Sequence, residues 1–140
     1  YDDGEGELSD AASVLDWLQQ YNTNSKICWV AGFSFGAWVA MQLLMRRPEI
    51  NGFISISPPA SSRDFSFLAP CPSSGLIVHG DKDNIASFDS TKILVEKLQK
   101  QKKVNIQFKQ IKGADHFYEN FTNEFNQTID DYIKNTIVQN

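Results

Sequence analysis

Hydrophobic and polar residues alternate along this chain with two periods, which predict helices in some segments and strands in others. Apolar residues at helical spacing predict an amphipathic helix from Leu8 to Tyr21, with acidic residues in and before its first turns, where the helix dipole favours them. The same spacing predicts helices from about Phe35 to Arg46, from Ser87 to about Gln101, and from about Asn120 to Ile137. The apolar positions of the first helix are Leu8, Ala11, Ala12, Val14, Leu15 and Leu18.

Helix boundaries and buried faces also follow from particular residues. Arg47-Pro48 predicts the end of the second helix, because the residue before proline is pushed out of the helical region. Ser87 is expected to cap the third helix. Its inner stripe is expected to be Ile93, Leu94 and Leu98. The last helix carries on one side Phe121, Phe125, Ile129, Tyr132 and Ile133.

Short apolar runs between these helices predict strands. They span Ile27 to Ala31, Gly52 to Ser57, Gly75 to Gly80 and Val104 to Ile111, the last alternating imperfectly with polar residues as a strand near a sheet edge does. Residues 22–25 read as a polar turn and residues 60–74 as irregular. Strands that alternate with helices predict one α/β domain over residues 1–140, with a mostly parallel sheet and helices on both faces.

Composition narrows the class of protein. The chain is 41% hydrophobic and 21% charged, which argues against disorder and against a multispanning membrane protein. Its net charge of −4 lacks the basic excess expected of a nucleic-acid-binding surface. Cys28 and Cys71 form no metal-binding spacing and no disulfide framework, which fits a reducing, cytoplasmic compartment.

One apolar stretch, ICWVAGFSFGAWVAMQLLM at residues 27–45, allows two interpretations. It is long enough to span a bilayer, and its glycines have the G-x-x-x-G spacing of packed membrane helices. It also reads as a strand, a sharp turn and a helix. The second interpretation is favoured, because the sheet predicted downstream needs residues 27–31 as a neighbour of its other apolar strands.

The turn inside this stretch has the pattern G-x-S-x-G of a nucleophile elbow. In such an elbow the serine adopts strained backbone angles, and Gly32 and Gly36 are expected to leave room for the close approach of strand and helix. Ser34 would then stand at the carboxyl end of the sheet, where open α/β folds bind ligands. The backbone N–H of Phe35 would be placed to stabilise an oxyanion.

A nucleophilic serine needs a base, and the chain offers two histidines. His79 lies inside an apolar strand, where a structural role is expected. His116 follows the strand ending at Ile111, in a loop that leaves the sheet at the same edge as Ser34, and is the better candidate.

The base in turn needs a carboxylate to orient its ring. Asp83 lies clear of the end of the strand Gly75 to Gly80 and is preferred over Asp81, which is expected to brace the turn. Asp115 is a neighbour of His116 in sequence, and such neighbours rarely orient a ring well. The resulting order of serine, aspartate and histidine is that of α/β-hydrolases.

Three segments carry a resemblance to a known group of enzymes. AGFSFGA, LIVHGDKDNIA and IKGADHFY resemble the nucleophile, acid and histidine motifs of the α/β-hydrolase superfamily, in particular its small bacterial members related to dienelactone hydrolases. The segment PPASSRDFSFLAPCPSSGLIVHGDKD is similar to one stretch of that group, and the resemblance extends from Asp2 to the end of the chain. Dienelactone hydrolases proper have cysteine in the elbow, so Ser34 points toward esterase-type chemistry.

The resemblance implies elements that these 140 residues lack. Members of the group begin with several strands and a helix ahead of the acidic helix, and a loop there supplies the second oxyanion N–H. The run ICWVA is apolar on both faces and suits the interior of a sheet. We therefore expect about 50 to 70 further residues before Tyr1 in the intact protein, the usual length of such strand and crossover units.

These observations predict a serine hydrolase of ester, thioester or related acyl compounds that needs no metal and no organic cofactor. A small-molecule substrate is expected, with an apolar pocket that includes Phe33, Phe65 and Phe67, and neither nucleic acid nor membrane is expected as a partner. Two alternatives remain: a serine peptidase of the prolyl-oligopeptidase type, and a catalytically silent α/β-hydrolase-like domain used for binding. The oligomeric state does not follow from the sequence.

Overall fold

The computed structural model describes residues 5–21 and 26–138, and the predicted turn at residues 22–25 lies outside them. Helices and strands alternate along the described chain. In order, the elements are α1 (Glu5–Tyr21), β1 (Trp29–Phe33), α2 (Phe35–Arg46), β2 (Gly52–Ile56), the short 3-10 helix η1 (Ser66–Leu68), β3 (Gly75–Gly80), α3 (Phe88–Gln99), β4 (Ile106–Ile111) and α4 (Thr122–Val138).

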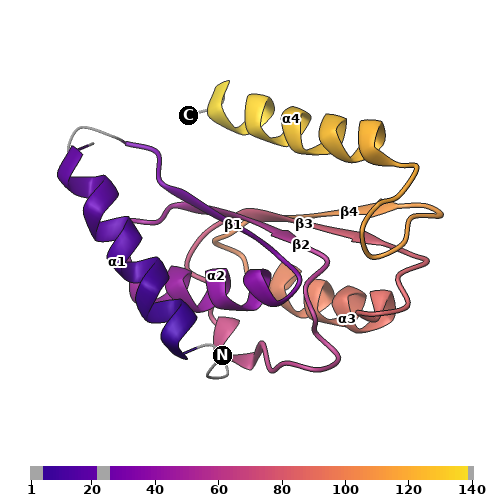
Figure 1. Cartoon of the computed structure of the whole chain (residues 1–140), viewed down its shortest axis with the longest axis horizontal. Helices are drawn as coiled ribbons and strands as arrows, with labels where there is room; N and C mark the ends of the chain where they lie inside the picture. The colour runs from indigo at the N-terminus through magenta and orange to yellow at the C-terminus, as the bar shows by residue number, and fades with distance from the viewer. Residues whose placement is uncertain (1–4, 22–25, 139–140) are drawn as a thin grey trace.

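The described strands form one parallel sheet in the order β1-β2-β3-β4. Helix α4 covers one face of this sheet, and α1, α2 and α3 lie on the other (Figure 1). The predicted α/β architecture with helices on both faces is therefore confirmed, and β4 is a sheet edge as its imperfect alternation indicated.

Each face of the sheet has its own apolar core, because successive side chains of a strand point to opposite faces. In β2, Phe53 packs in the core shared with α1, α2 and α3, whereas Ile54 packs in the core under α4. In β3, Ile77 belongs to the first core and its neighbours Leu76 and Val78 to the second. The two central strands are thus buried on both sides, as their continuous apolar runs predict.

The predicted inner faces of two helices need correction. In α3 the buried positions are Thr91, Val95 and Leu98, and Ile93 is 55% exposed. In α1, Leu8 and Leu15 are buried, whereas the side chains Val14 and Leu18 are exposed. The predicted stripe of α4 holds, since Tyr132 is buried in the core under that helix together with partly buried Phe121, Phe125, Ile129 and Ile133.

The apolar stretch at residues 27–45 is a strand followed by a helix. Strand β1 begins and ends two residues later than expected and runs through Gly32 to Phe33, and α2 follows after Ser34. Among the described residues, none of the helices combines the length and apolar character needed to cross a bilayer. The membrane-anchor interpretation is wrong for this segment.

The parallel topology brings four connections to the same edge of the sheet. Ser34 follows β1, Ser57 follows β2, Asp83 lies after β3 and His116 lies after β4. Because carboxyl ends of parallel strands share one edge, residues that are far apart in sequence become neighbours there.

Candidate active site

Ser34 occupies a sharp turn between β1 and α2. Its backbone angles are φ 55° and ψ −121°, in a region that residues other than glycine rarely adopt. The Ser34 N–H donates a hydrogen bond of 2.8 Å to the carbonyl oxygen of Ile56, which ties the turn to the end of β2. The strain predicted for a nucleophile elbow is thus present at the serine.

The two glycines of the elbow have different roles. A Cβ placed on Gly32 would lie 2.3 Å from the carbonyl oxygen of Gly36 and 2.7 Å from the amide nitrogen of Ala37. A Cβ on Gly36 would meet no atom of the described chain within 4 Å. The expectation that both glycines are needed for space is wrong for Gly36, because the close approach is between its backbone and the α-carbon of Gly32.

His116 connects Ser34 to Asp83. Its Nε2 lies 3.0 Å from Ser34 Oγ, and its Nδ1 lies 2.6 Å from Asp83 Oδ2. A carboxylate only accepts hydrogen bonds, so the proton of the neutral ring belongs on Nδ1, which leaves Nε2 free to accept the serine proton. The structure therefore brings together the three residues that the sequence selected as nucleophile, base and acid.

Asp83 is held by donors on both carboxylate oxygens. Its side chain has no solvent exposure, and Oδ1 accepts the backbone N–H groups of Ile85 and Ala86, each at 2.8 Å. Burial of the carboxyl opposes its ionisation, but the N–H of Ala86, the side chain of His116 and the N–H of Ile85 outweigh it and lower the pKa of Asp83. The carboxylate form is favoured in this position.

The other candidate carboxylates are occupied elsewhere. Asp81 accepts the backbone N–H of Gly113 and the side-chain amide of Gln110, at 2.6 and 2.9 Å, and so braces the turn after β4. Asp115 accepts the backbone N–H of Glu119 at 2.9 Å. Both therefore stabilise the loop that carries His116 and do not orient its ring.

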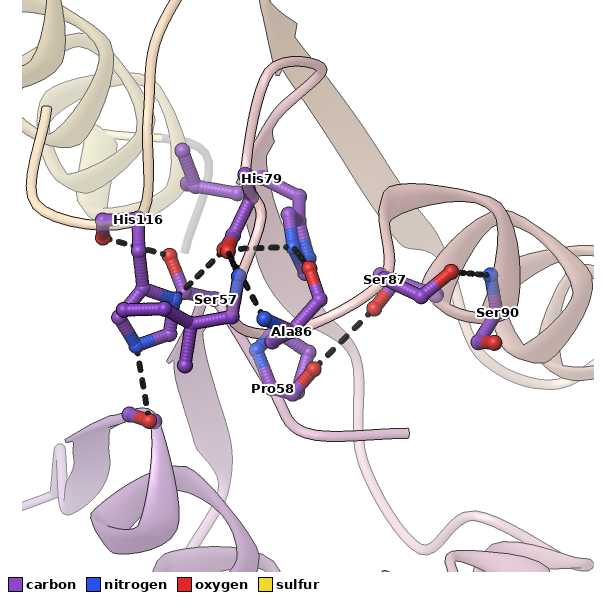
Figure 2. A network of polar contacts seen from close by, with 12 residues as sticks. Ser57, Pro58, His79, Ala86, Ser87, Ser90 and His116 are labelled. Carbon is purple, nitrogen blue, oxygen red and sulfur yellow. Dashed lines mark hydrogen bonds and ion pairs between the residues drawn. The ribbon is translucent and has the colours of Figure 1, made fainter. Parts of the chain in front are cut away.

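His79 is buried in β3, as expected, but it also contacts the candidate site. The side chain has no solvent exposure, and its Nε2 lies 2.9 Å from the carbonyl oxygen of Ala86 and 3.0 Å from Asp83 Oδ2. Burial lowers the pKa of His79 below its ordinary value, although its polar partners oppose this. His79 and His116 belong to one network of polar contacts (Figure 2).

A second buried pair supports the loop of His116. Tyr118 Oη lies 2.8 Å from Ser57 Oγ and donates to the carbonyl oxygen of Val78 at 3.2 Å, while Ser57 Oγ donates to the carbonyl oxygen of His116 at 3.3 Å. Burial raises the pKa of Tyr118 to about 12, so its hydroxyl stays protonated. Sequence reasoning missed this pair; the one available signal was a tyrosine two residues beyond the candidate base.

The residues of the predicted apolar pocket do not lie together. Phe33 packs beside His116, with ring centroids 5.0 Å apart. Phe65 is a core residue that stacks on Phe67 and lines a hollow of about 420 Å³ between the 60–69 segment and α3. The structure places Phe33 at the candidate site, whereas Phe65 and Phe67 belong to the layer of α2 and α3.

A different hollow borders the candidate site. Its volume is about 380 Å³, and it is lined by Phe33, Ile56, Phe117, Tyr118, Thr122, Phe125 and Asn126. Phe33 and Phe117, which both contact the ring of His116, are 40% and 63% exposed. An apolar group bound in this hollow would therefore lie next to the histidine.

The remaining predicted group, the backbone N–H of Phe35, belongs to the first residue of α2. N–H groups in the first turn of a helix point toward its N-terminal end. In this chain that end begins directly after Ser34, so the dipole of α2 is directed at the serine.

Comparisons with known proteins agree with this architecture. Residues 4–136 match the dienelactone hydrolase family. An uncharacterized protein of Rickettsia prowazekii is 53% identical over 137 residues, which are 95% of this chain and 58% of that protein.

Two solved structures are similar in fold and sequence. A protein of unknown function from Agrobacterium tumefaciens, described as a candidate α/β-hydrolase, has a TM-score of 0.95 and 54% identity over 98% of this chain and 63% of its own. An α/β serine hydrolase homologue from Coxiella burnetii has a TM-score of 0.79 and 31% identity over 91% of this chain and 59% of its own.

The chain thus spans about three fifths of the length of each of these relatives, between 58% and 63%. The match to the family begins one residue before α1, ends within α4 and includes every residue of the candidate site. This chain belongs to the dienelactone hydrolase family, with an α/β-hydrolase fold.

Proposed function

We propose that this protein is a serine hydrolase that cleaves ester, thioester or related acyl compounds through Ser34, His116 and Asp83. One observation carries the proposal: the continuous contact from Ser34 Oγ to His116 Nε2, at 3.0 Å, and from His116 Nδ1 to Asp83 Oδ2, at 2.6 Å. Both distances are within hydrogen-bond range, as general-base activation of a serine requires. Membership of a hydrolase family supports the same class of reaction.

Each proton has a defined path in this mechanism. His116 Nε2 takes the proton of the Ser34 hydroxyl while Oγ bonds to the carbonyl carbon of the substrate, and the carbonyl oxygen becomes an oxyanion. The imidazolium then gives its proton to the leaving alcohol or thiol, and an acyl-serine remains. A water molecule activated by His116 attacks the acyl carbon, and Ser34 recovers its proton as the carboxylic acid leaves.

Two further groups contribute to the proposal. The N–H of Phe35, at the start of α2, is proposed to donate to the oxyanion, where a fixed donor stabilises charge that develops in the transition state. The hollow beside Phe33 and Phe117 is proposed to receive an apolar part of the substrate. The reducing environment suggested by the unpaired Cys28 and Cys71 leads us to propose a cytoplasmic location.

A fluorophosphonate probe tests the proposal, because it forms a covalent bond only with an activated serine. The full-length protein is expected to be labelled at Ser34, and the Ser34→Ala variant is expected to show no labelling. Ser62, which is exposed and whose hydroxyl contacts only the carbonyl of Pro59 among the described hydrogen bonds, provides the matched control, since Ser62→Ala should label like the wild type. Absence of labelling in folded wild-type protein would instead support a silent binding domain.

The substrate class can be measured on the same material. Hydrolysis of acyl esters of graded chain length is expected to depend on Ser34 and to favour substrates with an apolar group that fits the 380 Å³ hollow. A substitution that fills this hollow, Phe125→Trp, should shift the preference toward shorter chains. An unchanged preference would show that the substrate binds elsewhere.

A further inference from the structure

His79 lies one step beyond the three residues of the proposed mechanism. Its ring is completely buried, and its Nε2 is shared between the carbonyl oxygen of Ala86, at 2.9 Å, and Asp83 Oδ2, at 3.0 Å. Figure 2 shows His79 and Ala86 in the same network as His116. In the proposed mechanism this histidine has no role.

The partners of the ring determine its protonation state. A carbonyl oxygen can only accept a hydrogen bond, so Nε2 of His79 carries a proton. Nδ1 is buried and has no hydrogen-bond partner in the described part of the chain. A second proton on Nδ1 would leave a buried cation with an unpaired donor, which is costly, so the ring is the neutral tautomer with its proton on Nε2.

This tautomer directs an N–H group of His79 toward the carboxylate of Asp83. Oδ1 accepts two backbone N–H groups, and Oδ2 accepts the Nδ1–H of His116. The Nε2–H of His79, which donates to the carbonyl oxygen of Ala86, lies 3.0 Å from the same Oδ2. The carboxylate therefore has three hydrogen-bond donors and a fourth N–H group in contact with Oδ2.

We propose that His79 is a positioning residue for the hydrolytic reaction: its Nε2–H fixes the Oδ2 oxygen of Asp83 in the direction that orients His116. The proposal rests on the proposed function, in which Asp83 orients the base. The backbone N–H groups hold only Oδ1, so without His79 the position of Oδ2 depends on His116 alone. A carboxylate free to turn about Oδ1 would orient the imidazole less well.

A purely structural role of His79 would require only its contact with Ala86 and not its contact with Asp83. A hydrogen bond to Ala86 is sufficient to satisfy the one polar N–H of the neutral ring. The additional contact is made to the oxygen that also accepts His116, and both contacts are within hydrogen-bond distance. Removal of His79 should therefore change the reaction as well as the stability.

Two variants of similar volume separate these roles. His79→Gln keeps a side-chain N–H group that can reach the position of the imidazole Nε2, whereas His79→Leu fills the space without a donor. In full-length protein, His79→Leu is expected to lower kcat by about 10²-fold with KM nearly unchanged, because misplacement of a catalytic group has effects of this size. His79→Gln should restore most of kcat. All rates are expressed per folded molecule, measured by circular dichroism.

Nuclear magnetic resonance of histidine-labelled protein gives a readout that does not depend on catalysis. The ¹⁵N spectrum should show His79 as the neutral tautomer protonated on Nε2. The proton shared between His116 and Asp83 should give a signal far downfield of the backbone amides. This signal should shift or broaden in His79→Leu and stay near its wild-type position in His79→Gln.

The outcomes distinguish this inference from the proposed function. If wild-type protein hydrolyses no ester but the downfield signal responds to His79→Leu and not to His79→Gln, the positioning of Asp83 is supported and only the proposed function fails. If the enzyme is active and both variants keep kcat and the downfield signal while their thermal stability falls, the inference is overturned. A ¹⁵N spectrum with His79 protonated on Nδ1 would also overturn it.

Discussion

The turn at Ser34 depends on the absence of a side chain at the α-carbon of Gly32. The backbone of Gly36 approaches the α-carbon of Gly32 so closely that no Cβ fits there, and this contact fixes the angle between β1 and α2. The side chain of Ser34 is presented at the carboxyl edge of the sheet as a consequence. The strained φ of 55° at Ser34 is maintained by this packing and by the hydrogen bond to Ile56.

Alanine substitutions at the two glycines should therefore give opposite results. Gly32→Ala is expected to lower the free energy of unfolding by about 2 kcal/mol or more, because its Cβ meets only backbone atoms that cannot move aside. Gly36→Ala is expected to be neutral or slightly stabilising, since alanine has the higher helix propensity and no atom of the described residues lies within 4 Å of the added Cβ. Urea unfolding of both variants measures the difference, and equal destabilisation would contradict this account of the elbow.

The carboxylate of Asp83 should be essential for the reaction and not only for the fold. In Asp83→Asn one oxygen becomes an NH₂ group, which cannot accept the N–H groups that the oxygen accepted. We expect kcat to fall by about 10³- to 10⁴-fold, the size of effect seen when the acid of a serine triad is made an amide. Asp115→Asn is the control and should keep most of kcat; equal losses in both variants would show that Asp83 has no special role.

At this scale the sequence predicted the three residues of the mechanism but not their supports. Ser34, Asp83 and His116 follow strand ends in an order and spacing that can be read from the chain. The contact from His79 to Asp83 depends on how the loop after β3 folds back over its own strand, and no pattern of residue types encodes that. The different roles of Gly32 and Gly36 likewise depend on a distance between backbones.

Among the elements, the loop after β4 is the one whose position matters most for the reaction. It carries His116 and is tied to the end of β2 by Ser57 and to β3 by Val78, through the hydroxyl of Tyr118. Ser57 and Tyr118 both have positive φ, at 49° and 58°, so both connections contain strained backbone. The hydrogen bonds hold two strained loops against each other.

Removal of either hydroxyl should loosen this connection. Tyr118→Phe removes one of the two hydrogen-bond partners of the Ser57 hydroxyl and one of the two donors to the carbonyl of Val78. It is expected to cost about 1 kcal/mol of stability and to lower kcat. Ser57→Ala should have a smaller or similar effect. Because the two hydroxyls contact each other, the double variant should lose less stability than the sum of the single variants. Additive losses would show that the pair does not act as a unit.

The pattern of residues predicted the type of each element better than its boundaries. Every predicted helix and strand within the described residues is present, because runs of apolar residues match the two buried faces of a sheet that is covered by helices on both sides. The strands β1 and β4 begin two residues later than predicted, since pairing with β2 and β3 sets their register. Ile93 is exposed because α3 is rotated so that Thr91 and Val95 face the sheet. The spacing of apolar residues alone does not determine this rotation.

On the scale of the whole molecule, large apolar side chains are exposed on the first strand and the first helix of the described structure. Strand β1, at one edge of the described sheet, includes the exposed residue Phe33, and α1 exposes Val14 and Trp17. The sequence indicated that β1 is too apolar for an edge, but no pattern in the chain names its partner.

The buried groups of the site also determine how the stability of the whole molecule should depend on pH. Burial lowers the pKa of His79 below its ordinary value of 6.5. In the unfolded chain the ring takes up a proton as the pH falls through that ordinary value, whereas in the folded protein it does so only at a lower pH. Protons therefore favour the unfolded state, and the free energy of unfolding should fall as the pH is lowered below about 6.5.

The titration of Asp83 affects the stability of the protein in a separate and lower pH range. Its pKa lies below the ordinary 3.8, so its contribution to stability is complete above that pH and is lost as the pH falls through the lower, folded-state value. Between about pH 7.5 and about pH 5.5 the loss of stability from these two residues should come from His79 and not from Asp83.

Urea unfolding of wild type and His79→Gln at these two pH values tests this assignment. The variant lacks the titrating ring, so its stability should fall less between the two values than that of the wild type, whatever its absolute stability. If both proteins lose the same free energy of unfolding, another group is responsible for the acid sensitivity. In that case the buried ring of His79 would have to accept a proton in the folded state, which is opposed because its Nδ1 has no hydrogen-bond partner among residues 5–21 and 26–138.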